Sequence, residues 1–347
     1  MDPVTHVATG LLLSQLIPAP SRWVNAAAGV FFALLPDLDY FLFWSDRLGY
    51  IRFHRSLSHS LLVVPLLALA AAGLGRAWLG PRWFRPLFFL GLAVLVVHVF
   101  LDLATSYGTQ LFSPVSREKF TLDWLFIIDF YLTGLLAIGT AAALISPTWG
   151  RTAGVVSLAL VGGYLAVCGF YHHHALDLAR QVFHREAQQG ATVAALPQPL
   201  SNRRWQLVAA RPEAIKQALV ELPNGGYPGG AIKVQELKAP DSFANPCPRA
   251  PSLSYRPPGD LQVLSWNAVQ TPAVQFSPEA RRILDIYLDF TRFPLFFWAA
   301  PAREGLRLEW LDLRFAVPGR AFPFVLQLYV DDQGRLLHWQ IGGQCVG

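Results

Sequence analysis

Long apolar runs alternate with short polar loops along the first half of the chain. A helix that crosses the hydrocarbon core of a bilayer needs about 20 apolar residues. Four runs reach that length, at residues 60–79, 86–105, 124–145 and 152–171. Two shorter runs, 4–17 and 23–35, precede them and are separated by a Pro-Ala-Pro-Ser loop. We therefore predict four clear membrane spans and an N-terminal helical hairpin, which together place both ends of the bundle on one side of the membrane.

The pattern changes after Asp177. Residues 186–204 are rich in Gln, Pro and other polar groups, and a linker is predicted at 179–204. From Trp205 onward strands are expected, because apolar and polar positions alternate with the period of two of a half-buried strand. Leu306, Leu308 and Trp310 follow this alternation. Residues 311–315 continue it on the opposite parity, as a β-bulge would produce.

Two further elements of the second half are predicted from local signals. Residues 324–330 and 336–341 flank Asp331-Asp332-Gln333-Gly334, which suits a hairpin turn. A helix is expected after Ser277, which can cap its first turn, and Pro278, which suits its first position. The predicted fold class is an α-helical polytopic membrane bundle at 1–178, followed by a linker at 179–204 and a soluble α+β domain with antiparallel strands at 205–347.

Composition agrees with a membrane protein and argues against other classes. Hydrophobic residues make up 53% of the chain and charged residues 15%, against about 25% charged residues in an average soluble protein. The net charge of +5 comes from scattered Lys and Arg without a basic block, so no nucleic-acid partner is expected. The acidic start Met1-Asp2-Pro3 does not resemble a cleavable signal peptide.

Three cysteines are present, and none forms a CxxC pair, which disfavours a thiolate zinc site. Cys168 lies in an apolar run. Cys247 and Cys345 lie in the polar second half, where they could pair as a disulfide of an exported domain or remain free thiols.

The most informative residues are His and Asp side chains at the ends of the predicted helices. His98 and Asp102 stand four positions apart, so a helix places them on one face. Antiparallel packing brings the start of the run 60–79 and the end of the run 86–105 to the same membrane side, and the hairpin reaches that side too. One layer is therefore predicted to gather His6, Asp37, Asp39, His54, His59, His98 and Asp102.

Imidazole and carboxylate donors together suit zinc, manganese or non-haem iron. We expect one to three divalent ions, zinc foremost, which would activate a water for a hydrolytic displacement. The sequence has no serine elbow, phosphate-cradling glycine loop or dinucleotide fingerprint that would favour another chemistry.

Each of these residues also has a structural interpretation. A His beside a membrane helix is usually interfacial, and His98 with Asp102 could form only a structural hydrogen bond. Asp37 and Asp39 could cap or end a helix. Asp129, inside the run 124–145, could pair with an arginine, ligate the metal or orient a ligating His.

Charged and His residues near the predicted interfaces are less decisive. Arg55 could contact a substrate phosphate or be only a loop charge. The run His172-His173-His174 looks like a metal tract, but it lies where the last span leaves the membrane, so interfacial histidines are favoured.

Four motifs stand in an order that resembles the YdjM-like family of membrane-bound metal-dependent hydrolases. They are Thr5-His6…Gly10, Pro36-Asp37-Leu38-Asp39, His54-Arg55-x-x-Ser58-His59-Ser60 and His98-x-x-x-Asp102. Ser58 stands where the family typically has Thr. Residues 107–111 and 127–129 are also similar, so the resemblance covers about residues 5–131. More distantly, the pattern is similar to zinc-dependent phospholipase C and S1/P1-type nucleases, which implies phosphoester chemistry.

The leading hypothesis is therefore a metal-dependent hydrolase of a bacterial inner membrane that acts on a phosphoester or lipid-linked substrate. The expected metal ligands are His6, Asp37, His54, His59, His98 and Asp102. Asp39 and Asp129 would ligate the metal or support a ligand, and Arg55 would bind an anionic substrate group. Loop arginines do not decide the sidedness, but a possible Cys247–Cys345 pair favours a periplasmic site and C-terminal domain.

Two hypotheses from other classes make different demands. A transporter or metal-handling protein that used the same residues as an ion path would need polar groups through the full membrane depth, whereas these gather at one end. A bundle that merely anchored a binding domain would leave the intramembrane pair His98–Asp102 unexplained.

Overall fold

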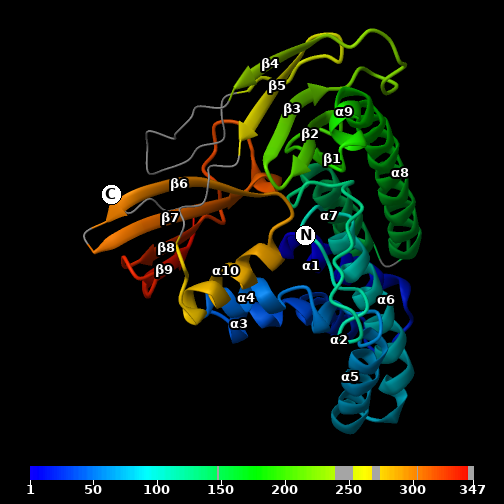
Figure 1. Cartoon of the computed structure of the whole chain (residues 1–347). Helices are drawn as coiled ribbons and strands as arrows, with labels where there is room; N and C mark the ends of the chain where they lie inside the picture. Colours follow the sequence, from blue (N-terminus) through cyan, green and yellow to red (C-terminus); the bar gives the residue numbers. More distant parts are fainter. Residues whose placement is uncertain (147, 239–252, 268–273, 303, 343–347) are drawn as a thin grey trace. The chain divides into compact units, whose positions relative to one another are not determined.

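The computed structural model describes residues 1–347 except 147, 239–252, 268–273, 303 and 343–347. The chain divides into two compact units: unit 1 holds Met1–Ser45 and Phe53–Gly169, and unit 2 holds Asp46–Arg52 and Phe170–Gly347. Unit 1 is built from helices, whereas the strands of both sheets lie in unit 2 (Figure 1). Cys247 and Cys345 lie outside the described residues.

The helices of unit 1 follow the apolar runs. They are α1 (Pro3–Leu16), α2 (Arg22–Leu34), α3 (Asp39–Leu42), α5 (Val64–Leu79), α6 (Phe84–Leu103), α7 (Phe130–Ile145) and the first part of α8 (Gly150–Val182). Three short 3-10 helices join them: η1 (Pro36–Leu38), η2 (Leu57–His59) and η3 (Pro81–Trp83). Helix α4 (Arg47–Phe53) belongs mostly to unit 2.

Two helices are long and apolar enough to cross a membrane, Pro81–Leu103 and Gly150–Val182. Two pairs of helices are separated by a sharp bend, and each pair counts as one further candidate span if its two helices cross the membrane together. They are Arg22–Leu34 with Pro36–Leu42, bent by 54°, and Arg47–His59 with Val64–Leu79, bent by 76°. The described chain thus has two to four candidate spans, and the prediction of four clear spans is not confirmed.

The run 124–145 differs most from the prediction. Its helix, α7, begins only at Phe130, because the Asp129 side chain accepts the Leu132 N–H at 2.9 Å and caps the helix there. Leu125 instead forms an isolated bridge with Thr105. The resulting apolar helix of 16 residues is short for a span.

Close contact between glycines holds the predicted N-terminal hairpin together. Gly10 of α1 and Gly29 of α2 face each other, and a methyl group added to either would meet the carbonyl oxygen of the other. At the end of α1, the Asn25 side chain donates to the carbonyls of Ser14 and Ile17 at 2.6 and 3.0 Å. The two helices therefore pack backbone against backbone, and the Asn25 side chain satisfies carbonyls at the end of α1 that have no partner within the helix.

Helix α6 is the centre of unit 1. It contacts α1, α2 and α5, and α1 also contacts α7. Leu90, Val94 and Leu95 of α6 lie in a buried core with Phe32 of α2 and Ala68 of α5. His98 and Asp102, near the end of α6, are consequently buried.

Unit 2 contains two sheets. Strands β1 (Thr192–Pro197), β2 (Arg204–Arg211), β3 (Ala214–Glu221), β4 (Val234–Lys238) and β5 (Leu261–Asn267) form a five-stranded sheet in the order β1-β2-β3-β5-β4. Strands β6 (Pro294–Ala302), β7 (Gly305–Asp312), β8 (Leu326–Val330) and β9 (Leu336–Ile341) form the second sheet in chain order. These pairings are antiparallel except β4 with β5. The predicted soluble domain rich in antiparallel strands is confirmed.

Residues 179–204, for which a linker was expected, instead hold the end of α8, helix α9 (His184–Gln188) and strand β1. Strand β1 pairs along its length with β2, and Ala194, Ala195 and Leu196 are buried. The polar residues that indicated a linker lie in α9 and around the turn after β1, so composition alone missed the buried strand between them.

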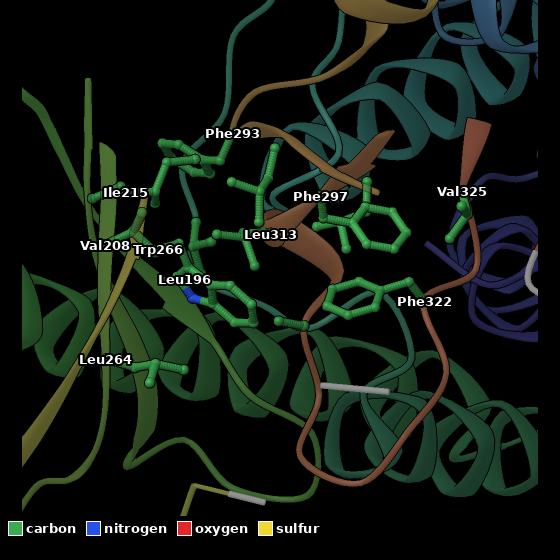
Figure 2. Close-up of a cluster of buried hydrophobic side chains, with 14 residues drawn as sticks. Leu196, Val208, Ile215, Leu264, Trp266, Phe293, Phe297, Leu313, Phe322 and Val325 are labelled. Atoms are coloured by element: carbon green, nitrogen blue, oxygen red, sulfur yellow. The ribbon is translucent and has the colours of Figure 1, made fainter. Parts of the chain in front are cut away.

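The two sheets pack face to face around an apolar core. Figure 2 shows Val208, Ile215 and Trp266 of the first sheet with Phe297 of β6 and Leu313, which follows β7, in one cluster. On the other face of the first sheet a second cluster joins the end of α8 to β2 through Leu178, Phe183, Trp205 and Leu207. Leu207 and Val208 thus serve opposite faces of β2, as the period of a strand requires.

The other local predictions in unit 2 are confirmed in part. Ser277 caps helix α10 (Pro278–Phe290) by accepting the Ala280 N–H at 3.3 Å, and β8 and β9 form the hairpin across Asp331. Residues 313–315 do not continue the strand: they form the 3-10 helix η4 (Leu313–Phe315), because the buried Asp312 carboxylate accepts the Arg314 N–H at 2.9 Å. The irregularity lies in β6 instead, between Phe296 and Trp298.

The glycine contact in the hairpin leads to a first prediction. Gly10→Ala should lower the free energy of unfolding by about 1–3 kcal/mol, the usual cost of overpacking, because the new methyl group meets backbone that cannot move aside. Gly73→Ala on α5 is the matched control, since open space surrounds Gly73. It should be neutral or stabilising by up to about 1 kcal/mol. Unfolding of both variants in detergent, followed by intrinsic fluorescence, tests this; equal midpoints would contradict it.

Candidate metal centre

Breaks in the helices bring the polar motifs together. Pro36 has no N–H to continue α2, so the chain turns through η1, which carries Asp37, and enters α3 at Asp39. The short helix η2 presents His59 just before α5. The last turn of α6 adds its two polar residues to this set. Each donor therefore sits on a helix end or a tight turn, where the backbone direction changes.

His59 and His98 form the centre of the cluster. Their Nε2 atoms lie 3.2 Å apart. Asp102 Oδ2 lies 3.0 Å from His59 Nε2 and 3.6 Å from His98 Nε2. Asp37 Oδ1 lies 3.4 Å and 3.7 Å from the same two nitrogens. One donor atom from each of these four residues thus lies within 4.8 Å of all the others.

The backbone fixes which nitrogen of His98 faces the cluster. His98 Nδ1 lies 2.9 Å from the Ala33 carbonyl oxygen. Because a carbonyl only accepts, Nδ1 must carry a hydrogen, so in the neutral ring that metal binding requires the lone pair is on Nε2, which faces His59. This arrangement, with Nδ1 anchored on a carbonyl and Nε2 facing the other donors, is typical of metal-binding histidines.

Asp102 is buried among groups that can carry positive charge. Arg55 Nη2 lies 2.9 Å from its Oδ1, and Arg55 Nη1 donates to the Asp102 carbonyl at 3.1 Å. The Met1 amino group also bonds to the Asp102 carboxylate. His59 Nε2 approaches Asp102 Oδ2 at 3.0 Å, within ion-pair distance.

Arg55 is held in an unusual conformation. Its φ of 60° lies in the left-handed region, which costs a side chain of this size about 1 kcal/mol or more. The guanidinium donates to Thr105 Oγ1 at 2.9 Å and lies 4.5 Å from the centroid of the Tyr107 ring, while the Arg55 carbonyl accepts the Gln110 N–H at 3.0 Å. The segment after α6 thus holds the backbone turn that aims Arg55 at the carboxylate.

His6 completes the buried set from α1. Its ring stacks on His98 with centroids 3.7 Å apart, and its Nε2 lies 3.4 Å from Asp102 Oδ1. Neither ring nitrogen has a hydrogen-bond partner among the described residues, although the side chain is 1% exposed. A buried imidazole with both nitrogens unsatisfied is costly, and an ion bound to one of them would remove part of that cost.

A second donor group adjoins the first. Asp37, Asp39 and His54 also offer one donor atom each within 4.8 Å of one another. His54 Nδ1 lies 3.1 Å from both carboxylate oxygens of Asp39. The His54 ring also makes edge contacts with the rings of His59 and Tyr107. Asp37 is therefore common to both groups.

The donor chemistry fits a divalent transition metal. Neutral imidazole nitrogens and carboxylate oxygens are the donors that zinc, manganese and iron take in proteins. His6, whose buried ring nitrogens lack hydrogen-bond partners among the described residues, is an orphaned donor that a bound ion would satisfy through one nitrogen. The described residues could thus hold a metal ion.

The residues predicted from the sequence divide into two sets. The structure brings together His6, Asp37, Asp39, His54, Arg55, His59, His98 and Asp102. Asp129 is placed differently: besides capping α7 it accepts the Tyr164 hydroxyl at 2.8 Å, and its described contacts are with neither donor group. His173 lies 3.2 Å from Asp177, and its side chain is 70% exposed.

Two contributors were missed at the sequence level. Thr105 and Tyr107 shape the site through Arg55, and neither is a residue type that signals metal binding. Only their positions in the sequence could have indicated a role at the site. Thr105 lies three residues after Asp102, and Tyr107 opens the segment 107–111, which resembles the family. Neither signal shows that the two side chains hold an arginine.

Apolar helices around a buried His and Asp cluster define a membrane protein with a candidate metal centre. Residues 1–175 match the profile of the YdjM inner membrane protein family, and the chain belongs to that family. The uncharacterized protein YfhP of Bacillus subtilis (strain 168) is 29% identical over 181 residues, which cover 49% of this chain and 53% of YfhP. The match thus spans about half the length of that relative. No solved structure matches the chain significantly.

The burial of Asp102 leads to a second prediction. Arg55→Ala leaves that carboxylate buried without its guanidinium partner, which typically costs about 3–5 kcal/mol of folding free energy. The loss should be largest in metal-free protein and smaller with added Zn²⁺, because an ion on Asp102 replaces part of the missing charge. Thermal unfolding in detergent, with and without Zn²⁺, measures both effects.

The matched control is Arg117→Ala, which removes an exposed guanidinium from a loop of the same unit. It should change the unfolding midpoint little, whether or not Zn²⁺ is present. If Arg55→Ala behaves like Arg117→Ala, the guanidinium does not compensate the buried carboxylate.

Proposed function

We propose that this protein is a membrane-bound metal-dependent hydrolase. The observation that carries the proposal is the convergence of Asp37, His59, His98 and Asp102 within 4.8 Å, at the end of an apolar helix. Ionisable groups in such a place are costly and are usually functional. Zinc suits this mixture of imidazole and carboxylate donors, and we expect the site to hold one to three ions.

Chemistry at this site would combine a metal ion with residues that orient it. A bound divalent ion would polarise a substrate oxygen and lower the pKa of a water molecule toward neutrality. The Ala33 carbonyl keeps His98 Nε2 free for ligation, and Arg55 holds the Asp102 carboxylate in place. Because its guanidinium is buried on Asp102, we assign Arg55 a positioning role in place of the substrate contact expected from the sequence.

We propose a phosphoester, and in particular a lipid-linked one, as the substrate. Tyr40, Phe41 and Trp44 closely follow Asp39, and 48%, 69% and 70% of their surfaces are exposed. Exposed aromatic side chains beside metal donors suit an amphiphilic molecule whose apolar part stays in the bilayer. The similarity of the motif order to zinc-dependent phospholipase C and S1/P1-type nucleases supports phosphoester chemistry.

We also propose that the chain crosses the inner membrane several times and presents the site to the periplasm. Residues 46–52 lie between Asp39 and His54 in sequence and belong to the same compact unit as the soluble domain. Within that unit, Arg47 Nη1 donates to the Ile341 carbonyl at 2.6 Å. This supports one membrane side for the segment 46–52 and the soluble domain.

The activity is tested with purified full-length protein in detergent or nanodiscs. Hydrolysis of a phosphodiester or phospholipid should need a divalent metal, disappear with a chelator and return with Zn²⁺. His59→Ala and His98→Ala should lower the rate by more than about 100-fold, the upper range for loss of groups that only support a ligand. Asp129→Asn should keep most of the activity, since Asp129 caps α7.

His184→Ala is the matched control, because the same side chain is removed from an exposed position in unit 2. It should retain wild-type turnover at equal membrane levels. Metal binding without hydrolysis of any phosphoester would favour a transporter or metal-handling protein. Full activity of the His59 and His98 variants would move the chemistry elsewhere in the chain.

The topology is tested by cysteine labelling in a chain whose own cysteines have been replaced. Single cysteines at positions 50 and 332 should both react with a membrane-impermeant maleimide in intact spheroplasts. A cysteine at 50 that reacts from the side opposite to 332 would be incompatible with the contact of Arg47 and Ile341. Protection of both until lysis would place the site in the cytoplasm.

A further inference from the structure

We infer that Asp37 bridges two metal ions, one held with His59, His98 and Asp102 and the other with Asp39 and His54. The inference rests on the proposed metal-dependent hydrolase and specifies its centre. Two donor groups, each compact within 4.8 Å, share Asp37 and no other residue. A carboxylate common to two donor sets is the usual bridge of a two-ion centre, whose ions lie about 3.5–4 Å apart.

The geometry of Asp37 allows this bridge. Its contacts with His59 Nε2 and His98 Nε2, at 3.4 and 3.7 Å, are both made by Oδ1. The proposed bridge uses the other oxygen of the same carboxylate for the second donor group. One carboxylate can then serve both ions, one through each oxygen.

The grouping of Asp37 and Asp39 around His54 favours an ion in the second donor group. His54 Nδ1 lies 3.1 Å from both oxygens of Asp39, where one N–H would be shared between them and an ion could take its place. Asp37 adds a second carboxylate within 4.8 Å of the first. Two neighbouring carboxylates repel each other, and Arg55 is already bonded to Asp102. A divalent cation among Asp37, Asp39 and His54 would offset that repulsion.

The two ions would differ in accessibility. The side chains of His59, His98 and Asp102 are at most 1% exposed, whereas those of Asp39, His54 and Asp37 are 11%, 10% and 21% exposed. The inner set offers four protein donors and the outer set three, so the outer ion keeps an open position for water or substrate. The inner ion should therefore be retained, and the outer ion should exchange and meet an anionic substrate group first.

Metal content and magnetic coupling test the inference without an activity assay. Full-length protein in detergent, loaded with Mn²⁺ and dialysed, should hold about two equivalents and give the EPR spectrum of an exchange-coupled pair. His54→Ala should hold one equivalent and give the six-line spectrum of an isolated ion. Asp39→Asn should do the same; it is the milder variant should His54→Ala fail to fold. Partial chelation of wild type should yield the same one-ion spectrum, since the outer ion leaves first.

His184→Ala should match wild type in both measurements. One equivalent in wild type, unchanged in His54→Ala and Asp39→Asn, would overturn the two-ion centre while leaving the metal-dependent hydrolase standing. Two equivalents without magnetic coupling would overturn Asp37 as the bridge. No bound Mn²⁺ or Zn²⁺ in folded wild type would overturn the proposed function itself.

Discussion

The carboxylate of Asp102 has to be compensated at the buried end of an apolar helix, and much of unit 1 is organised around that need. A charge without water or a partner there would cost several kcal/mol or more. Arg55 takes a left-handed backbone conformation to reach it, and His6 and His59 approach it from α1 and η2. The same convergence that compensates the carboxylate creates a set of nitrogen and oxygen donors around one point.

The helix breaks follow from this arrangement. Non-helical backbone at membrane depth is tolerated only where protein or a polar cavity satisfies it. The bends of 54° and 76° occur next to the segments that carry Asp37 and His59. These segments are the positions where the chain places its polar motifs. The breaks that shorten or bend the candidate spans are also what bring the donors together. In straight, unbroken helices the donor side chains would lie too far apart to meet.

The sequence predicted which residues gather, but not how each one is used. The i, i+4 spacing of His98 and Asp102 and the alternation of helix direction were sufficient to bring the donors to one layer. Arg55 and Asp129 have roles that depend on partners distant in sequence, the carboxylate of Asp102 and the hydroxyl of Tyr164. The role of Asp312 depends on a local backbone turn, in which it accepts the Arg314 N–H. Composition likewise gave no sign of strand β1, whose burial comes from pairing with β2.

The contact of Gly10 with Gly29 fixes the position of α1 relative to α2, and so the distance of each donor from this contact. His6 lies four residues before Gly10, about one helical turn, and Asp37 lies eight residues after Gly29. With the glycines locked together, an inserted or deleted residue between Gly10 and His6 would rotate the imidazole by about 100° away from His98. Length variation between relatives should therefore be found in the loop 17–21 or after the site, while the intervals that separate glycine from donor stay constant.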